Sequence, residues 1–204
     1  MERIQFHADN PNKRDLKKLA EEINKGAIFI FPTDTMYALG CLMNQRAGIE
    51  KICRILNKKE KQTKMSLICP NISVVSKYTQ QIDNQVFKAM KRYLPGPYTF
   101  ILKSNNYVQK YFKNNREEIG IRIPDNILIL ELLEILEVPV ISTSLNTDGE
   151  FQHSFNDPED IFAVFENKVD ILIDTGTIIG GESTVIDCTN EEMEIVRQGI
   201  GPIE

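Results

Sequence analysis

Hydroxyl and amide side chains follow an apolar run in the segment PVISTSLN, residues 139–146. After a β-branched pair come Ser142, Ser144 and Asn146, all of which can hydrogen-bond the phosphate or sugar oxygens of a ligand. At the end of a strand the same residue types also cap a turn or the next helix. The segment alone therefore leaves two interpretations open, a ligand site and a structural cap.

Similar polar groups stand beside other apolar runs. FPTDTMYALG places Thr33, Asp34 and Thr35 after one run, and GGESTVID places Ser183 just before another. A single such cluster is typical of a turn. Their repetition favours a binding site, because α/β sheets bind ligands where their strands end.

Two arginines add positive charge to this set. Arg122 lies between two isoleucines in IGIRIP, so its side chain should point to the opposite face of a strand. Arg197 precedes two glycines in VRQGIG. A guanidinium binds two oxygens of a carboxylate or phosphate at once. Each arginine could instead pair with a structural carboxylate at the surface.

Several familiar catalytic motifs are missing from the sequence. It contains no GxxxxGK[ST] loop, no GxGxxG after the first strand and no GxSxG elbow. The two histidines are isolated and the four cysteines form no CxxC pair, so we expect no zinc site and no metal held by protein ligands. Phosphate would have to be bound by hydroxyls, backbone amides, Lys and Arg. The cysteines are expected to be buried free thiols.

Strands and helices mix along the whole chain and would position these groups. Helical spacing appears near residues 13–25, 46–56, 85–94, 126–137 and 157–167, and short apolar runs near 27–31, 66–69, 98–102, 119–123, 138–142, 169–175, 183–188 and 193–198 predict strands. No linker or repeat divides them. We predict one α/β domain over residues 1–204, a single twisted mixed sheet with flanking helices.

Bulk properties fit this prediction. The 204 residues are 42% hydrophobic and 26% charged, which is typical of globular proteins. The apolar runs are too short to span a bilayer and the start resembles no secretion signal, so we expect a cytoplasmic protein without membrane contact. The net charge of −5 hides an asymmetry: residues 1–122 carry 22 Lys/Arg against 11 Asp/Glu. Either this half forms a polyanion-binding surface, or the two halves interleave in space.

Taken together, these segments resemble the YrdC/YciO family. The similarity lies in FPTDTMYALGC, YLPGPYTFIL, IGIRIP, ISTSLN, STVID and VRQG, in this order over residues 31–199, and KICRI and STSLN are more similar to the YciO branch. The resemblance implies a YrdC/RibB-like α/β fold around a large, positively lined cavity. It also implies synthesis of L-threonylcarbamoyladenylate from L-threonine, bicarbonate and ATP, a step in the modification of tRNA adenosine.

The resemblance further implies roles for individual residues. Arg122 would bind the threonine carboxylate, beside Thr33, Thr35 and Ser183. The nucleotide would be bound by Ser142, Ser144, Asn146 and Arg197. Mg²⁺ would bridge the phosphates of ATP. No catalytic side chain is predicted, because the reaction needs positioned cations and donors more than a strong base.

One motif departs from the family. Where the YrdC branch has KxR for the triphosphate, this chain reads ILNKKEKQTKMSLIC. Different alignments place Lys58 with Glu60, or Lys59 with Lys61, at those positions. We take Lys58 and Lys61 as the candidates. This basic segment could serve ATP, bind RNA or be a solvated loop. The alternative function is therefore a YciO-like protein that binds double-stranded RNA or tRNA without synthase activity.

Overall fold

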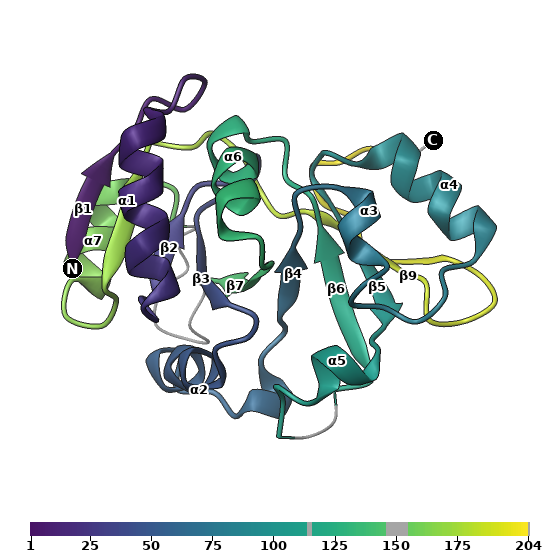
Figure 1. The fold of residues 1–204 in the computed structure, drawn as a ribbon. Helices are drawn as coiled ribbons and strands as arrows, with labels where there is room; N and C mark the ends of the chain where they lie inside the picture. The colour runs from purple at the N-terminus through teal and green to yellow at the C-terminus, as the bar shows by residue number, and fades with distance from the viewer. Residues whose placement is uncertain (114–115, 146–154, 204) are drawn as a thin grey trace.

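The computed structural model describes residues 1–113, 116–145 and 155–203 (Figure 1). In this part of the chain ten strands form one sheet, in the order β1-β8-β2-β3-β7-β4-β6-β5-β9-β10. The strands are β1 Glu2–Gln5, β2 Phe29–Phe31, β3 Ala38–Leu42, β4 Ser66–Ile68, β5 Tyr98–Lys103, β6 Glu118–Arg122, β7 Val140–Ser144, β8 Ile171–Asp174, β9 Thr184–Asp187 and β10 Glu194–Arg197. Parallel and antiparallel neighbours both occur, so the predicted mixed sheet is confirmed.

Helices flank both faces of this sheet, as predicted. They are α1 Lys13–Asn24, α2 Arg46–Ile55, α3 Ile72–Val75, α4 Asn84–Tyr93, α5 Asn106–Gln109, α6 Ile127–Leu136 and α7 Pro158–Phe165, with a 3₁₀ turn η1 at Glu60–Gln62. Among the described residues, no helix is long and apolar enough to cross a membrane.

Local sequence explains where the long helices begin and end. In α1 the side chain of Asn12 accepts hydrogen bonds from the amides of Arg14 and Asp15, and the chain leaves the helix at Gly26 with a φ of 106°. In α7 Asp157 caps the amide of Glu159 and Pro158 occupies the first turn. These boundaries agree with the sequence prediction.

Two strands escaped the prediction. Every residue of β3 is buried, so the apolar-polar alternation of a half-exposed strand is absent there. β1 is a four-residue strand at one end of the sheet, with the sequence ERIQ. Its single large apolar residue is too little periodicity to indicate a strand.

The helices divide into two layers, and each encloses a hydrophobic core. On one face α1 and α6 pack over the inner strands, with Leu16, Leu19 and Leu132 against Phe29 and Val140. On the other face, residues of α2, α3, α4, α5 and α7 pack against Leu67, Ile121 and their neighbours. Beyond α6, polar residues replace the apolar ones on the first face, and the candidate site lies there.

The two oppositely charged halves of the chain interleave. Strand β8 lies between β1 and β2, and β7 lies between β3 and β4. Ion pairs also join the two halves, such as Arg3 with Asp174 and Lys51 with Asp170.

Candidate functional site

Arg122 is the centre of the candidate site. It ends β6 and is only 9% exposed. Ile121 and Ile123 belong to the core on the other face of the sheet, so the expected direction of the arginine is confirmed. Its Nη2 atom donates to Oδ1 of Asp34 at 2.6 Å and to the hydroxyls of Thr33 at 3.1 Å and Thr35 at 2.5 Å.

The environment of this guanidinium has opposing effects on its pKa. Burial lowers the pKa of Arg122, the negative charge of Asp34 raises it, and nearby Arg197 lowers it. Arginine nevertheless stays charged under all ordinary conditions. The structural pairing with a carboxylate considered for Arg122 thus exists. It leaves two buried atoms without a partner in the described structure, Nε of Arg122 and Oδ2 of Asp34.

The loop between β2 and β3 holds the two threonines beside Arg122. Thr33 donates from its hydroxyl to the carbonyl of Met36 and accepts from the amides of Thr35 and Met36. Both threonine side chains are buried, and their hydroxyls lie 3.0 Å apart. The TDT segment is thus a local turn that fixes hydroxyls and a carboxylate around one guanidinium.

Ser183 and Arg197 form a second polar group nearby. Arg197 donates through Nε and Nη2 to the carbonyl of Ser183, and through Nη2 to its hydroxyl at 3.1 Å. The hydroxyl of Ser183 also lies 3.0 Å from that of Thr99 in β5. Glu182 pairs with Nη1 of Arg197 at 3.2 Å. Because Arg197 lowers the pKa of Arg122, the two groups belong to one electrostatic environment.

Ser142 and Ser144 lie on the same face of the sheet as Arg122. Ser142 pairs in register with Ser66 of β4, which pairs with Gly120 of β6, two residues before the arginine. A Cβ atom at Gly120 would overlap the hydroxyl of Ser66, so this row accepts only small side chains. None of the three serine hydroxyls makes a hydrogen bond within the described residues, and residues 146–154, shortly after Ser144, lie outside them, so both interpretations of Ser142 and Ser144 stay open.

The loop from Thr175 to Ser183 crosses this region. At its start, the hydroxyl of Tyr37 donates to the carbonyl of Gly176 at 2.8 Å and accepts from the amide of Thr175. Further on, Gly180 passes so close to the carbonyl oxygen of Thr35 that a Cβ atom would overlap it. The loop therefore connects both polar groups, the one around Arg122 and the one around Ser183.

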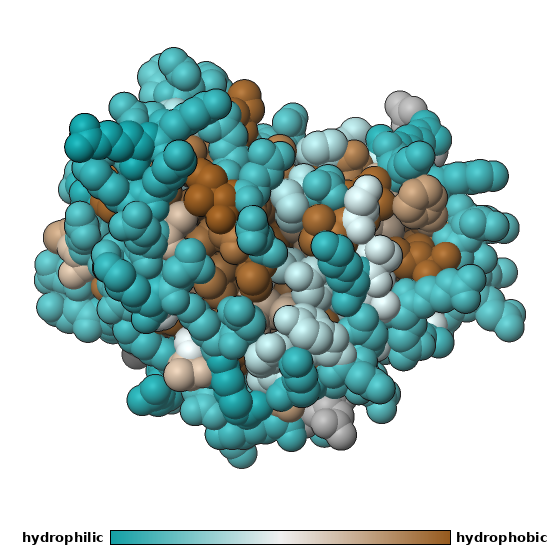
Figure 2. All heavy atoms as spheres, in the orientation of Figure 1, coloured by the Kyte–Doolittle hydropathy of each residue, from teal (hydrophilic) through white to brown (hydrophobic). Residues whose placement is uncertain are grey.

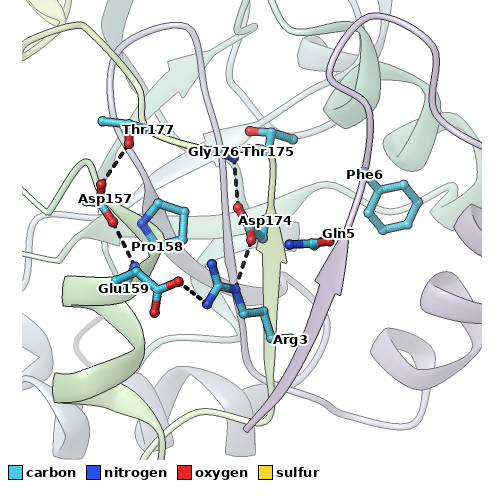
Figure 3. A pocket seen from close by; sticks show the side chains of 10 residues that line it. All are labelled: Arg3, Gln5, Phe6, Asp157, Pro158, Glu159, Asp174, Thr175, Gly176 and Thr177. Atoms are coloured by element: carbon cyan, nitrogen blue, oxygen red, sulfur yellow. Dashed lines mark hydrogen bonds and ion pairs between the residues drawn. The ribbon is translucent and has the colours of Figure 1, made fainter.

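A surface cavity of about 440 Å³ lies beside the start of this loop (Figure 3). Its polar side chains bind one another: Arg3 pairs with Asp174 at 2.8 Å and with Glu159 at 2.7 Å, and Thr177 donates to Asp157. Asp174 also accepts from the amide of Gly176. We interpret these contacts as an anchor for the loop, because the charged groups are already paired.

The basic segment before β4 stands apart from these contacts. Lys61 is exposed in η1, and Lys58 is half-buried. Glu60 accepts from the amide of Lys113 at 2.5 Å and lies 3.7 Å from Arg46. The negative charge of Glu60 is thus already compensated by Arg46 and the amide of Lys113. Asn146 lies outside the described residues.

Three residues of the site were not predicted from the sequence. Thr99, Ser66 and Tyr37 sit in or next to short apolar runs and looked like ordinary strand residues. Asp34 stood out as part of TDT but was not assigned to a substrate. Their partners depend on which strands and loops lie side by side in the fold. The spacing of residues in the sequence does not show this.

The four cysteines make no disulfide in the structure. Cys41, Cys53 and Cys69 are buried, as predicted, and Cys188 is half-buried. Burial raises the pKa of Cys41 and Cys69 to about 12, so both are thiols rather than thiolates at neutral pH. Among the described residues, no group of three or more His, Cys, Asp or Glu could hold a metal ion.

The fold and the site together define an α/β protein with two arginines and a set of hydroxyls on one face of a mixed sheet. The model of the Sua5/YciO/YrdC family, described as "Telomere recombination", matches residues 21–199. The chain belongs to this family.

Members of the family differ in how similar they are to this chain. The uncharacterized protein YciO of Escherichia coli K12 is 38% identical over 201 residues, covering 98% of this chain and 96% of its own. The crystal structure of E. coli YciO has a TM-score of 0.90 at 37% identity and covers 99% of this chain and 98% of that one. The predicted similarity to the YciO branch is confirmed.

Threonylcarbamoyl-AMP synthases are more distant. The enzyme of Pyrococcus abyssi is 29% identical over 185 residues, which cover 89% of this chain and 53% of that protein. The crystal structure of P. abyssi Sua5 complexed with L-threonine has a TM-score of 0.88 at 24% identity, and covers 98% of this chain and 58% of that one. This structural likeness establishes a common fold.

Proposed function

We propose that this protein synthesises L-threonylcarbamoyladenylate from L-threonine, bicarbonate and ATP. The observation that supports this most is the buried Arg122, which contacts Asp34 and two threonines while its Nε has no hydrogen-bond partner among the described residues. A buried guanidinium with a free donor suits the carboxylate of an amino acid. The L-threonine complex of P. abyssi Sua5 supports threonine as that amino acid.

The reaction has two steps, and each forms one bond and breaks another at carbon or phosphorus. The amine of threonine and bicarbonate form a carbamate with loss of water. A carbamate oxygen then attacks the α-phosphorus of ATP, and the bond from that phosphorus to the bridging oxygen of the β-phosphate breaks. Pyrophosphate leaves with the electron pair. The carbamate, the triphosphate and the leaving pyrophosphate are all anionic, so positioned cations and donors lower the barrier.

The site residues divide between the two substrates. Threonine would be bound by Arg122, Thr33, Thr35 and Ser183. The nucleotide would be bound by the hydroxyls of Ser142 and Ser144, together with Asn146. Arg197 donates a hydrogen bond to Ser183, and its positive charge would help to bind the nucleotide. Lys58 and Lys61 would approach the triphosphate, and Mg²⁺ would arrive bound to it. The mixed anhydride formed is labile, which suits transfer in the cytoplasm to a tRNA-modifying enzyme.

A pyrophosphate-release assay tests this proposal. The folded protein is incubated with ATP, Mg²⁺ and bicarbonate, with and without L-threonine. We expect release that depends on threonine. Release without threonine, or none at all from folded protein, would contradict the proposal.

RNA binding is the second candidate, favoured by the exposed lysines at positions 59, 61 and 64. Such a segment can bind phosphates of structured RNA without reading sequence. Titration with tRNA at two salt concentrations separates this function from the first. Affinity that falls with salt in the absence of pyrophosphate release would favour it, and no affinity at low salt would exclude it.

A further inference from the structure

The end of the sheet opposite β1 carries an exposed apolar groove that no proposed substrate uses. Its volume is about 420 Å³, between helix α4 and the hairpin of β9 and β10. Apolar residues on both sides line it: Ala89, Tyr93, Ile186, Met193, Ile195 and Ile203. Figure 2 shows brown, apolar surface among teal, hydrophilic surface on one face of the molecule.

Two large apolar side chains that line this groove are strongly exposed. Met193 is 43% exposed and Ile195 48%, and all four residues of β10 are exposed at the free edge of the sheet. Isolated apolar residues on a surface are ordinary, but a contiguous group beside an open strand marks an interaction surface.

The two elements that flank the groove have opposite net charge, and of their charged residues Lys88 and Arg92 line the groove itself. Helix α4 carries three Lys/Arg and no Asp/Glu, whereas residues 187–194 of the hairpin carry four Asp/Glu and no Lys/Arg. Within the described chain, Lys88 and Lys91 form no ion pair with the hairpin. Lys91 lies instead over the ring of Phe87, 5.2 Å from its centre.

We propose that this groove is the interface of a homodimer. A two-fold axis along the groove places α4 of each copy against the hairpin of the other, so both contacts join unlike charges over a shared apolar floor. A nucleic acid would be repelled by the hairpin wall, and a peptide of one charge would match one wall only. A second copy satisfies both walls at once.

Charge-reversed variants test this geometry directly. One variant carries Lys88→Glu and Lys91→Glu on the helix, and another carries Glu191→Lys and Glu192→Lys on the hairpin. Each alone should place like charges together at both contacts and be monomeric. Their mixture should restore a dimer, because each reversed wall then meets its complement.

The measurement is sedimentation velocity over a hundredfold range of protein concentration. Wild type should dimerise, and Ile195→Glu should weaken dimerisation at least tenfold. Ile127→Glu on α6, equally exposed at 47% but remote from the groove, should leave it unchanged. Circular dichroism verifies that each variant is folded.

Three outcomes would overturn the proposal. The first is a wild-type protein that is monomeric at every concentration. The second is a dimer that survives Ile195→Glu in folded protein. The third is a mixture of the two charge-reversed variants that stays monomeric, since it would exclude the contact of α4 with the hairpin of the other copy.

Discussion

Arg122 and Asp34 form a buried ion pair across the site, with Nη2 and Oδ1 2.6 Å apart although the residues are 88 positions apart in the chain. The pair neutralises a guanidinium at the point where an anionic substrate would bind. Asp34 compensates the buried charge of Arg122, and it would also compete with an anionic substrate for the same cation. Its two roles can be separated experimentally.

Replacing Asp34 with Asn should separate them. The amide keeps a hydrogen-bond acceptor for Arg122 but removes the negative charge. We expect a loss of about 3 kcal/mol in the free energy of unfolding, because a buried charge loses its counterion. We also expect tighter binding of the threonine carboxylate. Urea unfolding and calorimetric titration measure these effects, and weaker threonine binding in folded protein would show that Asp34 contacts the substrate favourably.

Arg122→Lys should distinguish bidentate binding of a carboxylate from an effect of positive charge alone. Lysine keeps the charge but cannot present two parallel N–H donors. A lost charge-assisted hydrogen bond corresponds to roughly tenfold in affinity or more. We expect the half-saturation concentration for threonine to rise by about this factor and that for ATP to rise much less. Equal increases for both substrates would be evidence against a threonine-specific role.

Ser142→Ala and Ser144→Ala address the serine row. Their hydroxyls have no hydrogen-bond partner among the described residues, so the free energy of unfolding should change by less than about 0.5 kcal/mol. ATP binding should weaken in both variants, as measured by titration. Unchanged ATP affinity with a lowered melting temperature would instead support a structural cap.

Gly180→Ala tests the loop that crosses the site. A methyl group there overlaps the carbonyl oxygen of Thr35, so the loop must move away from the threonines. We expect a large loss of pyrophosphate release. Gly181→Ala is the matched control, because its methyl group meets only the flexible side chain of Ile200 at 2.9 Å. Equal activity of the two variants would mean that the position of the loop is not critical.

Asp157→Ala tests the anchor of the same loop through its pH dependence. Hydrogen bonds from Thr177 and from the amide of Glu159 lower the pKa of Asp157 below 3.8. Its contribution to stability is therefore complete above pH 3.8 and is lost as the pH falls through the lower pKa of the folded state. The variant should melt at a lower temperature than wild type at pH 7, and the difference should shrink toward pH 3. A difference independent of pH would assign the effect to something other than ionisation.

The sequence by itself determined the five longer helices and eight of the ten strands of the described chain, and it indicated which residue types could bind a ligand. Periodicity, caps such as Asn12 and Asp157, and the isoleucines around Arg122 are local properties, and local geometry follows from them. The sequence did not predict the fully buried β3, because a strand covered on both faces shows no alternation of apolar and polar residues. Only the tertiary structure decided which groups meet. It joined Arg122 to Asp34, Ser183 to Thr99 and Ser142 to Ser66, because contacts between distant segments depend on strand order and register.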